Sequence, residues 1–318
     1  MIDPANIPNL KKKPSNDVCV KSLLNITPLD YKPKALQVVN IGPYGAGVGH
    51  HEFTRDGEQA YQQTVAYLVT GNEQYASNAA FILDSWAKTC KVFTGSNAPL
   101  EAGWGTASMA KAAELLKYTW SAKWNASGVE QRYVAFVNKL MLPVLTKPLG
   151  WDDANNWGLT RCEARLQIAI LKNDVGEFNG RLDEYRRILP RYVQANGQTG
   201  ELARDLVHAQ FGTGSLIQIA EIAWHQGVDI YNLYNNRMWT TLELVAAVLQ
   251  GYVPPNLKPS DIKEPWFLPC GWDIGYNHYN RRKKLPMPKV ASLMSKKRPE
   301  KYTFHWGLGS LTHWNGRP

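Results

Sequence analysis

Two residues in the second half of the chain have the types and the spacing to act on an anionic substrate. Arg204 and His208 are four positions apart in a stretch, residues 199–220, whose apolar side chains recur with helical spacing. If the helix is continuous from Glu201, both side chains project from one face. A permanent cation beside a titratable imidazole can bind a carboxylate and move a proton. The alternative is a core helix with a satisfied polar patch.

Composition limits the kinds of partner. The chain has 318 residues, long enough to bury a substantial core, and a formal net charge of +9 that attracts polyanions. Its 12 Trp and 15 Tyr residues combine flat apolar faces with hydrogen-bonding edges, which suit sugar rings as well as protein cores. Because no nucleic-acid-binding motif and no apolar run of transmembrane length is visible, we expect neither nucleic acid nor a membrane as partner.

The sequence shows no pattern for a metal or a cofactor. The four cysteines are widely spaced and form no CxxC pair, although one or two disulfides remain possible. The glycine-rich segment 40–57 lacks the spacing of a nucleotide-binding loop. Its adjacent His50 and His51 point in different directions, and no second cluster completes a metal site. This segment forms either a structural turn or a loop that presents His51 toward a groove.

Helices must position these residues. After an extended N-terminal arm over residues 1–35, helical patterns come in four pairs: 58–69 with 73–90, 105–121 with 128–144, 156–172 with 176–195, and 201–226 with 236–250. The pairs predict an all-α, layered architecture without strands before residue 251, in a single domain over residues 36–318. A proline-rich coil, one or two short helices and an apolar tail that docks on the body complete the chain.

These segments resemble, in order, the alginate lyase family of polysaccharide lyases. The segments that carry the resemblance are 61–87, 97–104, 113–118, 155–158, 201–231 and 276–288. The resemblance implies an incomplete (α/α) toroid of helical hairpins whose central groove binds an acidic polysaccharide. It also implies a secreted or periplasmic lyase of the glucuronan or polymannuronate type, although the opening residues do not have the pattern of a signal peptide. Oligomeric state stays open.

The resemblance also assigns catalytic roles by position. Asn156 occupies the place of the family's asparagine, and Arg204 matches the family's arginine. Trp157 stands where some branches carry the catalytic histidine. His208 lies at or near the place of the catalytic tyrosine, so we expect it to take over proton transfer or charge neutralisation. Structural alternatives are a helix cap for Asn156 and an ion pair for Arg204.

Because His208 lies at or near the place of the family's catalytic tyrosine, we expect the catalytic phenol to come from the late segment 276–288 instead. Tyr279 is the predicted catalytic phenol, with Tyr276 as the second choice, although both are residue types that often serve in packing. Further substrate contacts are expected from side chains that stack on sugars or bind carboxylates: Trp157, Trp104, His51, Tyr276 and Arg282.

β-Elimination explains why these residue types are needed. The reaction removes the proton on C5 of a uronate and expels the glycosidic oxygen on C4, through a dianionic intermediate that amide and cationic donors stabilise. A base must reach the C5 proton, and an acid must protonate O4. In β-1,4-linked glucuronan or mannuronate-rich alginate the two positions lie on the same side of the ring. His208 together with Tyr279 therefore fits a syn elimination, without a metal.

Two other functions are compatible with the sequence. An α/α-barrel glycoside hydrolase would need two opposed carboxylates, and the candidates Asp152, Asp153 and Glu163 cluster around one helix start. A non-catalytic acidic-polysaccharide binding protein would keep the groove without the chemistry, and the tryptophan at position 157 keeps this alternative open.

Overall fold

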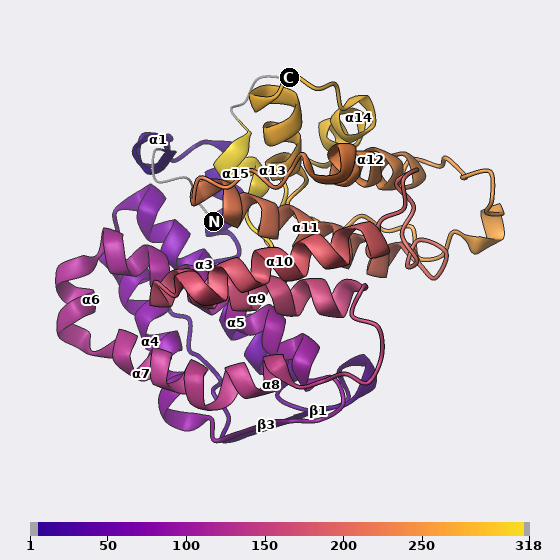
Figure 1. The fold of residues 1–318 in the computed structure, drawn as a ribbon. Helices are drawn as coiled ribbons and strands as arrows, with labels where there is room; N and C mark the ends of the chain where they lie inside the picture. Colours follow the sequence, from indigo (N-terminus) through magenta and orange to yellow (C-terminus); the bar gives the residue numbers. More distant parts are fainter. Residues whose placement is uncertain (1–5, 315–318) are drawn as a thin grey trace. The chain divides into compact units, whose positions relative to one another are not determined.

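In the computed structural model of this protein, residues 6–314 are described, and helices dominate (Figure 1). The described residues divide into two compact units. The N-terminal unit comprises residues 6–149 and 163–179, and the C-terminal unit comprises residues 150–162 and 180–314. The prediction that residues 36–318 act as one domain stays a prediction.

The first predicted helical pair is confirmed in the N-terminal unit. Helices α3 (His50–Thr70) and α4 (Glu73–Thr89) are joined by a tight connection, and α5 (Ala98–Thr119) packs against both (Figure 1). Gly71 ends α3 in the left-handed region, with φ of 71°, where glycine is favoured. The side chain of Asn72 then caps α4 by accepting the Gln74 N–H at 3.0 Å. Both are signals that the sequence displays.

The second predicted pair is present, with an additional short helix between its two members. After α5 the chain forms α6 (Ser121–Ser127), α7 (Val129–Phe136), a π-helical turn (Val137–Met141) and α8 (Leu142–Thr146). Gly128 separates α6 from α7 with φ of 64°. The predicted helix over 128–144 is therefore present as one unbroken helical run, residues 129–146, with a π-helical turn inside it.

A small sheet corrects the prediction that no strand precedes residue 251. Its strands are β1 (Val38–Ile41), β2 (Gly47–Val48) and β3 (Val92–Thr94), in the order β2-β1-β3. β1 pairs antiparallel with β2 and parallel with β3. Gly47 has φ of 100°, and a Cβ there would lie 2.1 Å from the carbonyl oxygen of Asn40. The first half of the glycine-rich segment thus belongs to a hairpin over residues 38–48, too short for alternation to reveal.

The N-terminal arm contains two short helices, α1 (Ile7–Lys11) and α2 (Val18–Leu24), rather than only extended chain. Asp17 caps α2 by accepting the N–H groups of Cys19 and Val20. Side chains of α3 and α4 bind the carbonyls that follow: Gln63 binds Pro28, and Asn78 binds Leu29. Helices of this length are too short for periodicity to predict.

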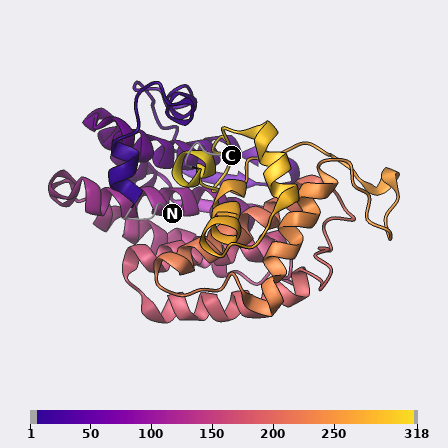
Figure 2. The ribbon, with the colours of Figure 1, turned by 90° about the horizontal axis from the view of Figure 1, so that it is seen from above.

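The C-terminal unit is built around α11 (Leu206–His225). The third pair is confirmed as α9 (Asn156–Lys172) and α10 (Val175–Tyr192), although both helices cross the boundary between the units. The fourth pair is α11 with α12 (Leu233–Val248). After a coil come α13 (Trp272–Tyr276), a π-helical turn (Asn277–Arg282), α14 (Pro288–Lys297) and α15 (Gly309–His313). α14 lies beside α12 (Figures 1 and 2).

The apolar tail docks on α11, as predicted. The indole of Trp306 lies against Gly214, where a Cβ would come within 2.4 Å of the ring. His305 Nε2 and the hydroxyl of Ser215 form a buried hydrogen bond of 3.0 Å. The two glycines that interrupt the apolar pattern of α11 therefore have a packing reason, since Gly212 similarly faces the hydroxyl of Tyr192.

Two absences concern the described residues only. No helix within residues 6–314 combines the length and the apolar character needed to span a membrane. The four cysteines, all inside this range, are buried and unbridged.

Candidate active site

Asp205 determines where α11 begins. Its backbone is extended, with φ of −169° and ψ of 160°, and its carboxylate accepts the backbone N–H of His208 at 2.7 Å. The helix therefore starts at Leu206, and the predicted continuous helix from Glu201 is wrong. Arg204 precedes the helix, so it does not share a helical face with His208. An aspartate directly before an apolar helical run is a capping signal, and the sequence contains it at Asp205.

The same carboxylate orients the imidazole of His208. Nδ1 of His208 lies 2.7 Å from Oδ2 and 2.8 Å from Oδ1 of Asp205. Because an ionised carboxylate only accepts, Nδ1 carries the proton, and in the neutral ring Nε2 carries the lone pair. The side chain of His208 is 23% exposed, and its ring contacts Phe211 with centroids 5.6 Å apart. This is the arrangement of a general base that a second residue holds in place.

Glu201 connects Asn156 to the start of α11. Its carboxylate accepts the backbone N–H of Asn156 at 2.9 Å and the hydroxyl of Tyr192 at 2.7 Å. Its backbone oxygen accepts the N–H groups of Arg204 and Asp205 at 2.9 and 3.0 Å. Burial raises the pKa of Glu201 to about 7, although these donors and Arg204 oppose the shift. The buried carboxyl group of Glu201 therefore holds the backbone of Asn156, and its backbone oxygen holds those of Arg204 and Asp205.

Asn156 is the first residue of α9 but does not cap it. Asn155 fills that role, since its side-chain oxygen accepts the N–H groups of Trp157 and Gly158 at 2.9 and 3.1 Å. The amide of Asn156 is buried, and neither its oxygen nor its nitrogen has a hydrogen-bond partner among residues 6–314. Leaving a buried polar group unpaired costs about 1–3 kcal/mol. An unpaired buried amide indicates a role that the folded chain alone does not supply.

Arg204 presents its charge to solvent. Its side chain is 55% exposed, and its Nε lies 3.7 Å from the carboxylate of Asp205. A contact of this length at the surface contributes little to stability. The guanidinium is therefore available for an anionic ligand beside the Asp205–His208 pair.

Tyr279, the predicted catalytic phenol, is more deeply buried than His208. Tyr279 is 1% exposed, and its hydroxyl donates to the backbone oxygen of Tyr231 at 2.7 Å. Burial raises the pKa of Tyr279 well above its usual value. These are the surroundings of a packing residue, so the prediction of Tyr279 as the catalytic phenol is not supported. Tyr276 is half-buried, with the guanidinium of Arg298 5.8 Å from its ring centre.

The side chain of Arg282 is bound by other residues of the protein. Its two terminal nitrogens each donate to the carboxylate of Glu221 at 2.9 Å, and its guanidinium lies 5.1 Å from the ring centre of Trp224. The predicted role in substrate binding is therefore not supported, because release of Arg282 would leave a buried carboxylate uncompensated.

Two exposed tryptophans, Trp151 and Trp266, are candidates that the sequence patterns did not single out, and the predicted Trp157 contacts the first of them. Trp157 is half-buried, and the ring of Trp151 meets it edge to face with centroids 5.5 Å apart. Trp151 is 56% exposed. Trp266 is also exposed, on a segment whose backbone oxygen at Trp266 binds the side chain of Gln210 in the second turn of α11. Burial, which the sequence does not display, is the signal that distinguishes these residues from core tryptophans.

Two predicted contacts belong to the N-terminal unit. His51 is exposed in the first turn of α3, with its ring 4.6 Å from that of His50, which in turn binds Glu101 at 2.8 Å. Trp104 is buried in α5. Their roles in substrate binding stay predictions.

The carboxylates of the hydrolase alternative are already paired. Asp152 and Asp153 both form ion pairs with Arg191, the latter at 3.3 Å. Glu163 is fully buried in the N-terminal unit against Lys111, at 3.2 Å. Each of these carboxylates therefore already has a cation partner within the protein.

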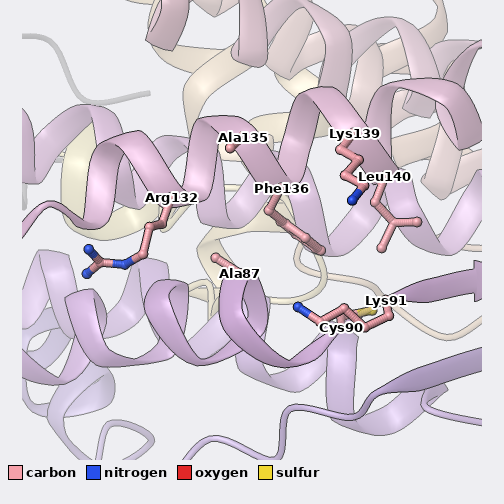
Figure 3. A pocket seen from close by; sticks show the side chains of 8 residues that line it. All are labelled: Ala87, Cys90, Lys91, Arg132, Ala135, Phe136, Lys139 and Leu140. Atoms are coloured by element: carbon pink, nitrogen blue, oxygen red, sulfur yellow. The ribbon is translucent and has the colours of Figure 1, made fainter.

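A cavity of about 380 Å³ lies in the N-terminal unit, away from these residues in the chain. Figure 3 shows Arg132 at one end and Lys91 and Lys139 toward the other. Arg132 binds Asp84 at 2.6 Å, and the Lys91 ammonium binds the backbone oxygen of Lys88. None of the residues predicted from the sequence lines this cavity.

The comparisons with known proteins place this helical chain among the polysaccharide lyases. The family model described as Alginate lyase matches residues 46–255, which is more than half of the chain. The protein therefore belongs to the alginate lyase family, as the sequence motifs indicated. No curated protein matches the chain.

Solved structures show the same fold. Alginate lyase A1-III from Sphingomonas species A1 is 18% identical, with a TM-score of 0.73 over 98% of this chain and 94% of that chain. A variant of that enzyme complexed with tetrasaccharide is 18% identical, with a TM-score of 0.72 over 98% and 95%. An alginate lyase from Bacteroides ovatus is 14% identical, with a TM-score of 0.65 over 98% of each chain. The predicted all-α toroid fold is confirmed.

Proposed function

We propose that this lyase cleaves β-1,4-linked polyuronates, either glucuronan or mannuronate-rich alginate, by syn β-elimination, with His208 as the proton-transfer residue. The hydrogen bond between His208 Nδ1 and Asp205 carries the proposal. It leaves Nε2 of a partly exposed imidazole to accept a proton, and it stabilises the imidazolium that forms.

Arg204 and Asn156 are the proposed carboxylate-binding groups. Removing the C5 proton places a second negative charge on the uronate, next to its carboxylate. The exposed guanidinium of Arg204 offers paired donors, and the unpaired amide of Asn156 offers a neutral one. Each donor of this kind is commonly worth ~3–4 kcal/mol in the transition state. Because the Asn156 amide is shielded from solvent, side chains around it must move when substrate binds.

One imidazole suffices for both proton transfers. Nε2 of His208 takes the C5 proton, the C4–O4 bond breaks as the C4–C5 double bond forms, and the imidazolium returns the proton to O4. Donor and acceptor positions lie on the same side of the sugar in β-linked glucuronate and mannuronate, so the ring need not be approached from both faces. Guluronate presents them on opposite faces and requires a second group.

Other observations support a polyanionic sugar substrate. The net charge of +9 favours it electrostatically, and a relative with the same fold is known in complex with a tetrasaccharide. Trp151, Trp157 and Trp266 are proposed to stack on sugar faces. Since such polymers occur outside cells, we propose a secreted or periplasmic location.

The experiment is incubation of the purified protein with glucuronan, polymannuronate and polyguluronate, following the ultraviolet absorbance of the C4–C5 unsaturated end. We expect absorbance to rise with glucuronan or polymannuronate and to stay near background with polyguluronate. Reducing ends without absorbance would indicate a hydrolase. Binding without either product would indicate a non-catalytic protein, and turnover of polyguluronate alone would contradict the syn mechanism.

A further inference from the structure

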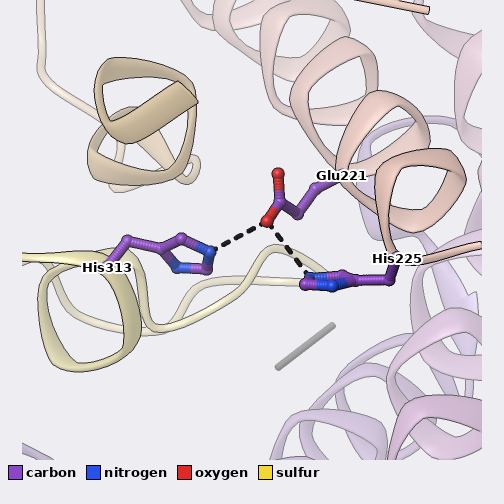
Figure 4. A group of neighbouring side chains, drawn as sticks. All are labelled: Glu221, His225 and His313. Atoms are coloured by element: carbon purple, nitrogen blue, oxygen red, sulfur yellow. Dashed lines mark hydrogen bonds and ion pairs between the residues drawn. The ribbon is translucent and has the colours of Figure 1, made fainter. Parts of the chain in front are cut away.

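Three metal-binding side chains converge at the other end of α11 from His208. Glu221 and His225 are one helical turn apart on α11, and His313 comes from α15 (Figure 4). The Oε1 atom of Glu221 lies 3.1 Å from Nε2 of His225 and 3.1 Å from Nε2 of His313. The three ligand atoms all lie within 4.8 Å of one another. In a tetrahedral zinc site, neighbouring ligand atoms are ~3.3 Å apart.

Nε2 of His225 faces Glu221 and His313 as an unpaired donor or acceptor. The side chain of His225 is 4% exposed, and its buried Nε2 has no hydrogen-bond partner among the described residues. Its 3.1 Å separation from the carboxylate therefore lacks the alignment of a hydrogen bond. A bound cation would occupy the lone pair that the protein leaves unused.

The hydrogen bonds of Thr312 favour a lone pair on His313 as well. The Thr312 hydroxyl donates to the backbone oxygen of Leu308 at 2.8 Å and lies 2.7 Å from Nδ1 of His313. With its one proton directed at Leu308, the hydroxyl accepts from Nδ1–H, and Nε2 of the neutral ring faces the carboxylate without a proton. In this tautomer a lone pair of Nε2 faces Oε1 of Glu221 at 3.1 Å, and a cation bridging the two atoms would stabilise the contact.

Glu221 is held ionised from its other side. Tyr231 donates to Oε2 at 2.7 Å, and Arg282 donates to both oxygens at 2.9 Å. Tyr231 and Arg282 thus act as the outer hydrogen-bonding partners that orient a ligating carboxylate.

We propose that Glu221, His225 and His313 bind one Zn²⁺ ion that fastens the C-terminal tail to α11. Two imidazoles and one carboxylate are a donor set that zinc favours. The ion would join residues 88 positions apart in the chain, His225 and His313, and it is independent of the proposed elimination chemistry. Its role is therefore structural, and its loss affects stability before activity.

The test measures metal content and thermal unfolding of the wild-type protein, without relying on activity. After dialysis against a chelator, the chain is reloaded with Zn²⁺ and its metal content is determined. We expect one zinc per chain, a fall in Tm on chelation on the order of 5 °C, and recovery on adding zinc. With Co²⁺ instead, visible absorption bands of four-coordinate cobalt are expected.

Variants then locate the ion. His225→Ala and His313→Ala are expected to weaken zinc binding at least ~10²-fold, whereas His51→Ala, in the other unit, should leave the stoichiometry unchanged. The cobalt spectrum of the wild type keeps the test decisive if His313→Ala fails to fold. Less than about a tenth of a zinc per wild-type chain, with no change in Tm, would overturn the proposal and show that a proton alone closes the cluster. Zinc retained by both variants would overturn it equally.

Discussion

Asp205 binds His208 twice, accepting its backbone N–H and its Nδ1–H, each at 2.7 Å. One carboxylate therefore starts α11 and selects the tautomer of the imidazole. The same carboxylate fixes the start of the helix and the orientation of the reactive nitrogen. Capping and orientation can therefore be separated only by a substitution that keeps the cap.

Asp205→Asn is that substitution. Asparagine caps helices about as well as aspartate, so we expect the Tm to stay within a few degrees of the wild type. The amide no longer stabilises an imidazolium or enforces Nδ1–H, and kcat should fall ~10²–10⁴-fold. Rates of unsaturated-end formation and thermal unfolding are measured together. As a control, Asp205→Ala should lose ~1 kcal/mol of stability as well. Wild-type kcat in the asparagine variant would exclude the orienting role.

Asn156→Leu separates stability from activity. The substitution removes a buried amide without a partner in residues 6–314 and keeps the backbone N–H that binds Glu201. We expect the free energy of unfolding to increase by about 1 kcal/mol and kcat to decrease ~10²–10³-fold. Denaturant unfolding and steady-state kinetics check the two effects. Loss of stability together with activity would show that Asn156 serves the fold instead.

Arg204 and Arg282 should respond in opposite ways to truncation. Arg204→Ala removes an exposed cation, so we expect unchanged stability and kcat/KM reduced ~10²-fold or more. Arg282→Ala leaves the buried Glu221 without its bidentate partner and should destabilise the protein by about 3–5 kcal/mol. Each variant serves as the control for the other. An Arg204 variant that is unstable but fully active per folded molecule would reverse the assignment.

The sequence predicted the fold well because its signals are local. Helix periodicity and the Gly71–Asn72 boundary identified the pairs α3–α4 and α9–α10. The errors have local causes too: the helical spacing predicts Asp205 within a helix that it actually caps, and β1 is too short for alternation to be visible.

The site was predicted in part because residue type does not reveal burial or hydrogen-bond partners. Tyr279 and Arg282 have suitable chemistry, but their polar groups are bound to Tyr231 and Glu221. Trp151 is exposed, a property that no pattern around it signals. The roles assigned to Asn156 and His208 stay predictions until they are tested.

Glu201 should make stability depend on pH. Its folded-state pKa of about 7 lies above the ordinary value of 4.5, so the folded state binds the extra proton. The stability that this proton contributes is fully present below pH 4.5 and is lost as pH rises through 7. Between pH 5 and pH 8, the free energy of unfolding of Glu201→Gln should therefore rise by about 2–3 kcal/mol relative to that of the wild type. Unfolding experiments at both values measure the difference. Parallel pH profiles for variant and wild type would exclude Glu201 as the titrating group.

The most direct test compares His208→Ala with Tyr279→Phe on whichever polyuronate the wild type cleaves. Formation of unsaturated ends is followed by ultraviolet absorbance, and Tm confirms that both variants are folded. We predict that His208→Ala reduces kcat at least ~10²-fold, whereas Tyr279→Phe, which loses only a buried hydrogen bond, keeps nearly the wild-type rate. A nearly unchanged rate in folded His208→Ala, or loss of turnover in folded Tyr279→Phe, would contradict His208 as the proton-transfer residue.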